Sequence, residues 1–208
     1  MREQAVHVVR VTGAAEDAIP AALRILDATG RPPGWQSIMV LRGREDVSLF
    51  ALYCDWDGPG QRQRCVESEA YRSAVELARE RLGVVVERSA SLREVLSHGV
   101  QPRQARVVTG ALLVAREGKG GEVRDAALGF YRRSVGWPGC VALTFAADFT
   151  LETFFLVQEW ERRQGLEYYL GHPERRAFLA SLADLLVSSP TWFEQVSLWE
   201  YHAQAKPA

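Results

Sequence analysis

Two stretches of the chain decide the fold: Pro138–Trp160 reads PGCVALTFAADFTLETFFLVQEW, and Pro33–Trp56 reads PGWQSIMVLRGREDVSLFALYCDW. Each opens on Pro-Gly, passes through two apolar segments separated by a polar turn, and closes on an acidic residue followed by Trp. The displacement is 105 positions at the start and 104 at the end. Similarity at a nearly constant displacement predicts an internal repeat, so we expect one structural unit written twice.

Two further matches keep the same order along the chain. Tyr71 corresponds to Phe178, and the segment 91–94 (Ser-Leu-Arg-Glu) corresponds to 197–200 (Ser-Leu-Trp-Glu). The hydrophobic periodicities within each copy also follow one order, which is strand, helix, strand, strand, helix, strand. The first copy predicts strands at 5–11, 38–41 and 47–54, a helix carrying Ile19, Leu23 and Leu26, and a helix carrying Tyr71, Val75, Ala78 and Leu82. The second copy predicts strands at 107–115, 141–146 and 153–160, and a helix carrying Phe178, Leu182 and Leu185.

The segment after Ser91 has two interpretations. Ser91-x-x-Glu94 has the form of a capping box, which would open a helix ending at Gly99. Its counterpart in the second copy, 196–201, is rich in β-branched and aromatic residues, which favour a strand. Because a repeat should fold the same way twice, we predict a strand in both places.

The predicted order makes the protein an α+β protein with two tandem ferredoxin-like βαββαβ repeats. The first repeat spans 1–97 and the second, better conserved in pattern, spans 105–208. The polar segment 98–104 is the expected linker. Each repeat has one sheet face without helices, which the other repeat can cover.

Composition excludes several classes of protein. The 25 basic and 26 acidic residues give a formal net charge of -1, which argues against sequence-independent binding of nucleic acid. No apolar run approaches the roughly 18 residues of a membrane helix, and the start lacks a signal-peptide core, so we expect no membrane association and a soluble, cytoplasmic protein. Its three cysteines and scattered histidines predict neither disulfides nor a metal site, and no dinucleotide or phosphate-binding loop occurs, so no bound cofactor is expected.

The second copy resembles the antibiotic biosynthesis monooxygenase family of dimeric α+β barrel proteins, here in tandem-repeat form. The resemblance rests on the segment 138–140 (Pro-Gly-Cys), on Glu159-Trp160, and on His172 six positions before Phe178. The first copy matches less well, with Cys65 at the place assigned to the His. The resemblance implies a pseudo-dimer within one chain, an intramolecular α+β barrel, with one pocket per repeat between helices and sheet. In the polyketide oxygenases of this family an Asn lies four residues before the Trp. Here that position is Leu156, and in the first copy it is Leu52.

The candidate site lies in the second repeat. Residues of equal parity on a strand share a face, so Phe154, Leu156, Gln158 and Trp160 should project together. His172 on the next helix is the candidate base, because its ordinary pKa of about 6.5 lies near neutrality. The alternative for His172 is a plain helix cap, and the alternative for Trp160 is a core residue. We predict His172, Trp160 and Gln158 as catalytic and Tyr168, Tyr169, Phe154, Leu156 and Trp137 as substrate-binding.

These residues lead to three hypotheses of function. The leading one, from the resemblance, is a cofactor-independent monooxygenase that oxidises a polycyclic phenol, anthrone or quinol with dioxygen, as in aromatic polyketide tailoring. The second is a haem-binding or haem-degrading protein with His172 as axial ligand. The third is a non-catalytic module that binds a small molecule. The expected partners are a small aromatic molecule and dioxygen, and further self-association of the chain stays open.

Overall fold

The computed structural model describes residues 3–12, 35–56, 60–99 and 107–200. It divides into two compact units, of which the N-terminal one is Met1–Ser91 with Val196–Ala208, and the C-terminal one is Leu92–Gln195. Both units combine an antiparallel sheet with helices, so the predicted α+β class is confirmed. Within these ranges no helix is long and apolar enough to cross a membrane.

The N-terminal unit has β3 at the centre of its sheet, paired antiparallel with β1 and β2. The three strands predicted for the first copy are confirmed, the first two with wider bounds and the third displaced by two residues toward the C-terminus. The helix predicted around Ile19, Leu23 and Leu26 falls outside the described residues. The elements of this unit are β1 (Glu3–Val11), β2 (Trp35–Gly43), β3 (Leu49–Trp56), α2 (Gln61–Glu67), α3 (Glu69–Leu82) and the first part of β4 (Val84–Gly99).

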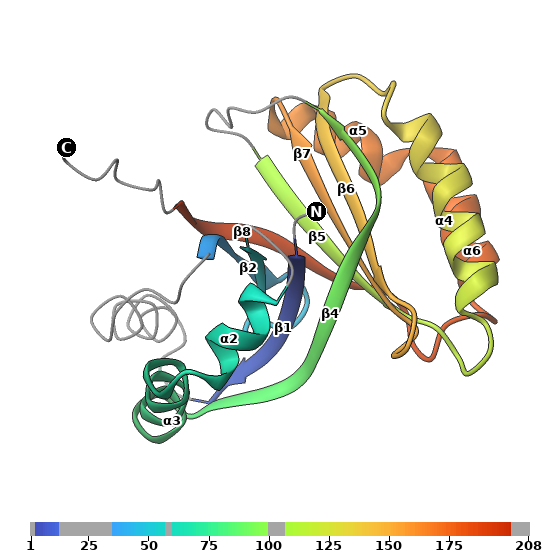
Figure 1. Cartoon of the computed structure of the whole chain (residues 1–208). Helices are drawn as coiled ribbons and strands as arrows, with labels where there is room; N and C mark the ends of the chain where they lie inside the picture. The colour runs from blue at the N-terminus through green and yellow to red at the C-terminus, as the bar shows by residue number, and fades with distance from the viewer. Residues whose placement is uncertain (1–2, 13–34, 57–59, 100–106, 201–208) are drawn as a thin grey trace, which may run out of the picture. The chain divides into compact units, whose positions relative to one another are not determined.

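The C-terminal unit repeats this arrangement with β7 in the central place. β7 pairs with β5 and β6, β5 also pairs with the start of β8, and β6 with the end of β4. Helices α4 and α6 run side by side along the sheet, and α5 lies near the end of β7 (Figure 1). The elements are β5 (Val107–Val114), α4 (Gly120–Ser134), β6 (Cys140–Asp148), β7 (Thr153–Trp160), α5 (Arg163–Gly171), α6 (Pro173–Leu182) and β8 (Thr191–Glu200).

Strand β4 settles the two interpretations of the segment after Ser91. It is one strand of 16 residues, so the capping-box pattern does not start a helix. Ala90 and Leu92 are buried while Ser91 and Arg93 are exposed, which is the alternation of a strand with one buried face. The gain from this burial outweighs the local preference of Ser-x-x-Glu for a helix start.

The order of hydrogen-bonded strands is the same in both units. It is β4-β1-β3-β2 in the first and β8-β5-β7-β6 in the second, the order of a ferredoxin-like sheet. Because β4 and β8 each contribute to both sheets, the full order β1-β3-β2-β8-β5-β7-β6-β4 is cyclic. This is the connectivity of the expected dimeric α+β barrel. His98 and Gly99 of the expected linker belong to β4, and residues 100–104 lie outside the described ranges, so the limits 1–97 and 105–208 stay a prediction.

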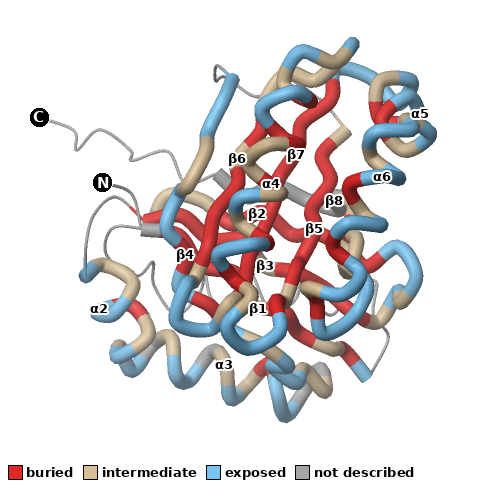
Figure 2. Tube along the Cα trace, turned by 90° about the vertical axis from the view of Figure 1, so that its right-hand side faces the viewer, coloured by how far each residue is buried: buried red, intermediate tan, exposed pale blue. Residues whose placement is uncertain are grey.

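The core of the C-terminal unit lies between its sheet and its helices. The strands are buried over most of their length, whereas the helices expose their outer faces (Figure 2). Phe130 of α4 stacks on Phe178 of α6 with ring centroids 4.3 Å apart. An aromatic pair of this kind adds about 0.5–1.5 kcal/mol beyond the burial of its rings, so it fixes the two helices to each other.

Candidate functional site

The helix-facing side of β7 is where the sequence placed the site. Phe154, Leu156, Gln158 and Trp160 are each 0–1% exposed. Phe154, Leu156 and Trp160 belong to the aromatic core against the helices, which confirms the expected shared face. Thr109 of β5 lies directly opposite Gln158 and therefore faces the same side.

Several polar side chains reach into this core without hydrogen-bond partners. Among the described residues, no partner is found for the hydroxyls of Thr109, Tyr131 and Tyr169, for either amide atom of Gln158, for Nε1 of Trp160 or for Nε of Arg175. We call these six residues the inner polar cluster. Each buried polar group left unsatisfied costs about 1–3 kcal/mol, so a cluster of them is costly for the fold and favours a binding role.

Tyr169 stands at the centre of this cluster. Its ring centroid lies 5.0 Å from that of Trp160. Burial raises the pKa of its hydroxyl to about 12, although Arg175 and Gln158 nearby oppose the shift. Burial raises the pKa of Tyr131 as well, well above its ordinary value. Both hydroxyls therefore keep their protons at neutral pH and can donate hydrogen bonds.

Arg175 brings a positive charge to the cluster from α6. Its guanidinium carbon lies 4.4 Å from the ring centroid of Trp192 and 5.2 Å from that of Tyr169. Its Nη1 is 3.5 Å from the carbonyl oxygen of Leu170, at the limit of a hydrogen bond. The aromatic faces hold the planar group in place through cation–π contacts and leave Nε–H unused.

The other predicted residues form a second group nearer the surface, which we call the outer aromatic group: Trp137, Tyr168 and His172. The ring centroids of Trp137 and His172 are 4.2 Å apart, and those of Tyr168 and His172 are 5.2 Å apart. Tyr168 is 48% exposed. Trp137 also lies 5.7 Å from Tyr169, so it joins the outer aromatic group to the inner polar cluster.

His172 caps helix α6, as the alternative interpretation anticipated. Its Nδ1 accepts a hydrogen bond from the backbone N–H of Glu174 at 3.2 Å, and Pro173 occupies the first helical position. A neutral ring that accepts at Nδ1 carries its proton on Nε2. To bind a proton, or to serve as a haem ligand through Nε2, His172 must give up this cap.

The N-terminal unit has different side chains at the corresponding places. The junction between its two helices is Ser68, which caps α3 by accepting from the backbone N–H of Tyr71. Ser68 follows Trp56 by 12 positions, as His172 follows Trp160. The expectation that Cys65 stands at the place of His172 is therefore wrong, because Cys65 lies within α2. The error came from the Tyr71–Phe178 match, whose displacement of 107 positions is larger than the 104 positions that separate the two junction residues.

Sequence reasoning missed three members of the inner polar cluster. Thr109 lies in an apolar strand, Tyr131 resembles an ordinary core aromatic, and Arg175 lies on a helix rich in charged residues. The one available signal was that Arg175 occupies a helix position where the first copy has no charged residue.

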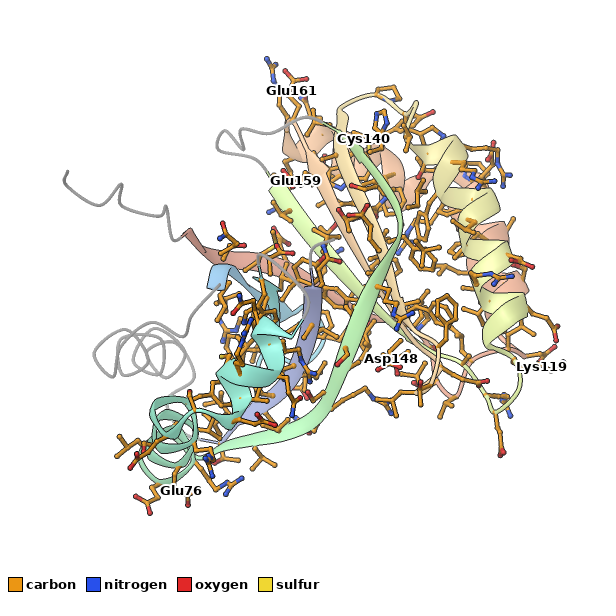
Figure 3. The ribbon with its side chains drawn as sticks, viewed as in Figure 1. Glu76, Lys119, Cys140, Asp148, Glu159 and Glu161 are labelled. Carbon is orange, nitrogen blue, oxygen red and sulfur yellow. The ribbon has the colours of Figure 1, made fainter. Side chains whose placement is uncertain are left out.

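Two labelled side chains, Cys140 and Glu159, lie beside the site: Cys140 pairs with Trp160 across β6 and β7 and packs against the same core. Cys140 and Glu159 are found toward one end of the C-terminal sheet, and Lys119 and Asp148 toward the other (Figure 3). Glu159 lies between Gln158 and Trp160 in sequence, so it projects from the opposite face of β7. Burial raises the pKa of the Cys140 thiol to about 11, with a smaller contribution from Glu159. Across the described ranges, no group of three or more His, Cys, Asp or Glu side chains is placed to hold a metal ion.

Comparison with known proteins identifies solved structures with a similar fold. No protein-family model and no curated protein sequence matches the chain. The solved structure of an anthrone oxidase-like protein is similar with a TM-score of 0.71 and 12% identity, covering 99% of this chain and 97% of the other. A candidate monooxygenase from Fusobacterium nucleatum gives 0.69 at 8% identity, covering 96% and 94%. A ferredoxin-fold protein from Listeria monocytogenes, described as related to antibiotic biosynthesis monooxygenases, gives 0.51 at 13% identity, covering 94% and 95%. The expected resemblance is therefore confirmed at the level of the fold: the chain has the tandem ferredoxin-like fold of these monooxygenase-like proteins, which cover 94–99% of it.

Proposed function

We propose that the C-terminal unit binds an electron-rich aromatic molecule and oxidises it with dioxygen, without a bound cofactor. The observation that supports this most directly is the inner polar cluster, a set of hydrogen-bonding atoms enclosed by aromatic side chains. A phenol, anthrone or quinol matches such surroundings, since its rings are flat and apolar and its oxygen atoms accept hydrogen bonds. Oxidation of this kind would suit the tailoring of aromatic polyketides.

The reaction proposed for an anthrone converts a ring CH₂ group to a carbonyl, consuming one O₂ and releasing one water. Loss of a proton leaves a delocalised anion, which gives one electron to O₂. The resulting substrate radical and superoxide combine to a hydroperoxide at carbon, and loss of water leaves the carbonyl. The anion is the species that the protein must stabilise, because electron transfer starts from it.

In this proposal the polar donors hold the anion and His172 takes the proton. Gln158, Trp160 and Tyr169 are preorganised donors in a buried setting, where hydrogen bonds to a charged oxygen are strongest. Proton uptake by His172 would break its bond to Glu174 and place a positive charge at the start of α6, which the helix dipole disfavours. Because this proton uptake is unfavourable by itself, it would depend on the donors that stabilise the anion left on the substrate. The proposed substrate-binding residues are Phe154, Leu156, Trp137, Tyr168 and Tyr169.

Oxygen uptake with 1,8-dihydroxyanthrone tests the proposal. We expect enzyme-dependent uptake of one O₂ per anthraquinone formed, in the presence of EDTA and without added flavin. Trp160→Phe should slow the reaction, whereas Trp56→Phe, the matched change in the N-terminal unit, should not. A rate equal to that of buffer would contradict the proposal and favour a non-catalytic binding module.

A further inference from the structure

The inner polar cluster contains more hydrogen-bond donors than acceptors. Nε–H of Arg175, Nε1–H of Trp160 and the hydroxyls of Tyr131 and Tyr169 have no acceptor at hydrogen-bond distance and angle among the described residues, although Tyr169 lies close enough to Tyr131, Gln158 and Arg175 to interact with them. The only group of the cluster that must accept is the amide oxygen of Gln158. A ligand that completes the cluster must therefore bring acceptor oxygen atoms.

The cluster also has a positive charge without a matching negative one. In the described part of the chain no carboxylate is found in an ion pair with Arg175, and two acidic residues on α6 and β8 pair with other arginines. Glu174 pairs with Arg133 at 3.2 Å, and Glu194 pairs with Arg163. Arg175 is half-buried, and its Nε–H is enclosed beside aromatic rings, so an anion that reached it would gain a charge-assisted hydrogen bond.

The helix after the junction carries no charge at this place in the N-terminal unit. Three positions after Ser68 stands Tyr71, which is uncharged and packs against the core, whereas three positions after His172 stands Arg175. In the N-terminal unit a positive charge near Cys54 and Cys65 comes from Arg62 of α2 instead. Helix α3 therefore forms without an arginine at this place.

We infer that the aromatic ligand of the C-terminal unit carries a carboxylate, which the guanidinium of Arg175 binds. The planar fork of a guanidinium matches the two oxygens of a carboxylate, and Tyr169 is near enough to share them. This inference rests on the proposed function and narrows its substrate class to aromatic carboxylic acids. The neutral donors Gln158 and Trp160 are left for the phenolic or carbonyl oxygen of the ring.

The test compares two ligands that differ in charge, anthraquinone-2-carboxylate and the neutral 2-(hydroxymethyl)anthraquinone. Binding to the full chain is measured by quenching of tryptophan fluorescence, since Trp137, Trp160 and Trp192 all lie close to Tyr169 or Arg175. We expect the carboxylate to bind about tenfold or more tightly than the neutral compound. Arg175→Met should remove this preference, while Arg176→Met, a matched change at an exposed neighbour, should keep it.

Arg175→Lys retains the charge and serves if the Met variant does not fold; it should keep a reduced preference for the carboxylate. Equal affinities in the wild-type protein, or a preference that survives Arg175→Met, would overturn the inference. Its failure is distinct from failure of the proposed function. Anthrone oxidation without carboxylate preference contradicts only the inference, and carboxylate preference without oxygen uptake contradicts only the oxidation.

Discussion

The cores of the two units fill the same positions with opposite chemistry. Gln158 and Tyr169 of the C-terminal unit correspond to Cys54 and Cys65 of the N-terminal unit, counted from Trp160 and Trp56. Both cysteines are buried, and burial raises the pKa of each thiol. At these two positions the N-terminal unit thus has small, weakly polar groups, whereas the C-terminal unit has strong hydrogen-bonding groups with no partner among the described residues. The difference teaches that the fold does not require an amide or a phenol at these two positions.

The largest expected effect is on turnover, and it distinguishes a catalytic base from a helix cap at His172. If His172 removes the substrate proton, both His172→Ala and His172→Ser should lose on the order of a hundredfold or more in rate. Serine can still cap α6, so only the Ala variant should also lose stability, by about 1 kcal/mol. The measurement is oxygen uptake combined with urea unfolding.

The matched control is Ser68→Ala in the N-terminal unit, which removes the corresponding cap of α3 and should leave the rate unchanged. A His172→Ser variant with the wild-type rate would show that His172 only caps its helix.

The next effect is the response of the N-terminal unit to acid. Burial, with Arg62 nearby, lowers the pKa of His7 from 6.5 to about 4. The unfolded chain therefore binds this proton more readily than the folded one, so stability is complete above pH 6.5 and falls as the pH drops toward 4. The loss should reach up to about 3 kcal/mol in urea unfolding.

His7→Gln can still bond to Ser89, which lies 2.8 Å from Nδ1 of His7, and it does not titrate. It should flatten this part of the pH profile. An unchanged profile in the variant would assign the acid response to other groups.

A smaller effect, on stability, tests the comparison between the two units by substitutions at the corresponding positions Gln158 and Cys54. Gln158→Leu removes two unsatisfied buried atoms and should stabilise the protein by about 1–3 kcal/mol while weakening ligand binding. Cys54→Gln introduces such a group into the N-terminal unit and should destabilise it by a similar amount. Thermal unfolding without ligand measures both. Destabilisation by Gln158→Leu would mean that Gln158 supports the fold, and the contrast between the units would fail.

The smallest effect concerns the pair that joins α4 to α6. Arg133 and Glu174 are 61% and 50% exposed, so their contact at 3.2 Å should contribute less than about 1 kcal/mol. A double-mutant cycle with Arg133→Gln and Glu174→Gln measures the coupling, which should weaken in high salt. A larger coupling would indicate that α6 depends on this pair more than on the stacked rings of Phe130 and Phe178.

The repeat in the sequence was sufficient to predict the fold because strand alternation and displacement reinforce each other. The shared face of Phe154, Leu156, Gln158 and Trp160 followed from parity alone, and the packing of Phe154, Leu156 and Trp160 in one core cluster confirms it. The strand after Ser91 followed only from its counterpart, since the local pattern favours a helix. Hydrophobic pattern is therefore informative wherever burial decides the conformation.

The site was predicted less completely for a physical reason. Hydrophobic pattern does not report whether a polar atom finds a partner, so the unsatisfied groups of Thr109, Tyr131 and Arg175 could not be recognised in the sequence. The role of His172 was open for a related reason, since a base and a helix cap use the same imidazole. Its hydrogen bond to Glu174 became visible only with the positions of both atoms.

The two long strands have a consequence for how the protein is made. The C-terminal unit includes the end of β4, which leaves the ribosome before any other part of that unit. The N-terminal unit includes the end of β8, which is synthesised after every other strand. Although domains generally fold in order of synthesis, here the unit that is started first cannot be completed until nearly the whole chain has emerged. Until then the edge of β2 that β8 covers is open, and we expect chaperones to meet the nascent chain there.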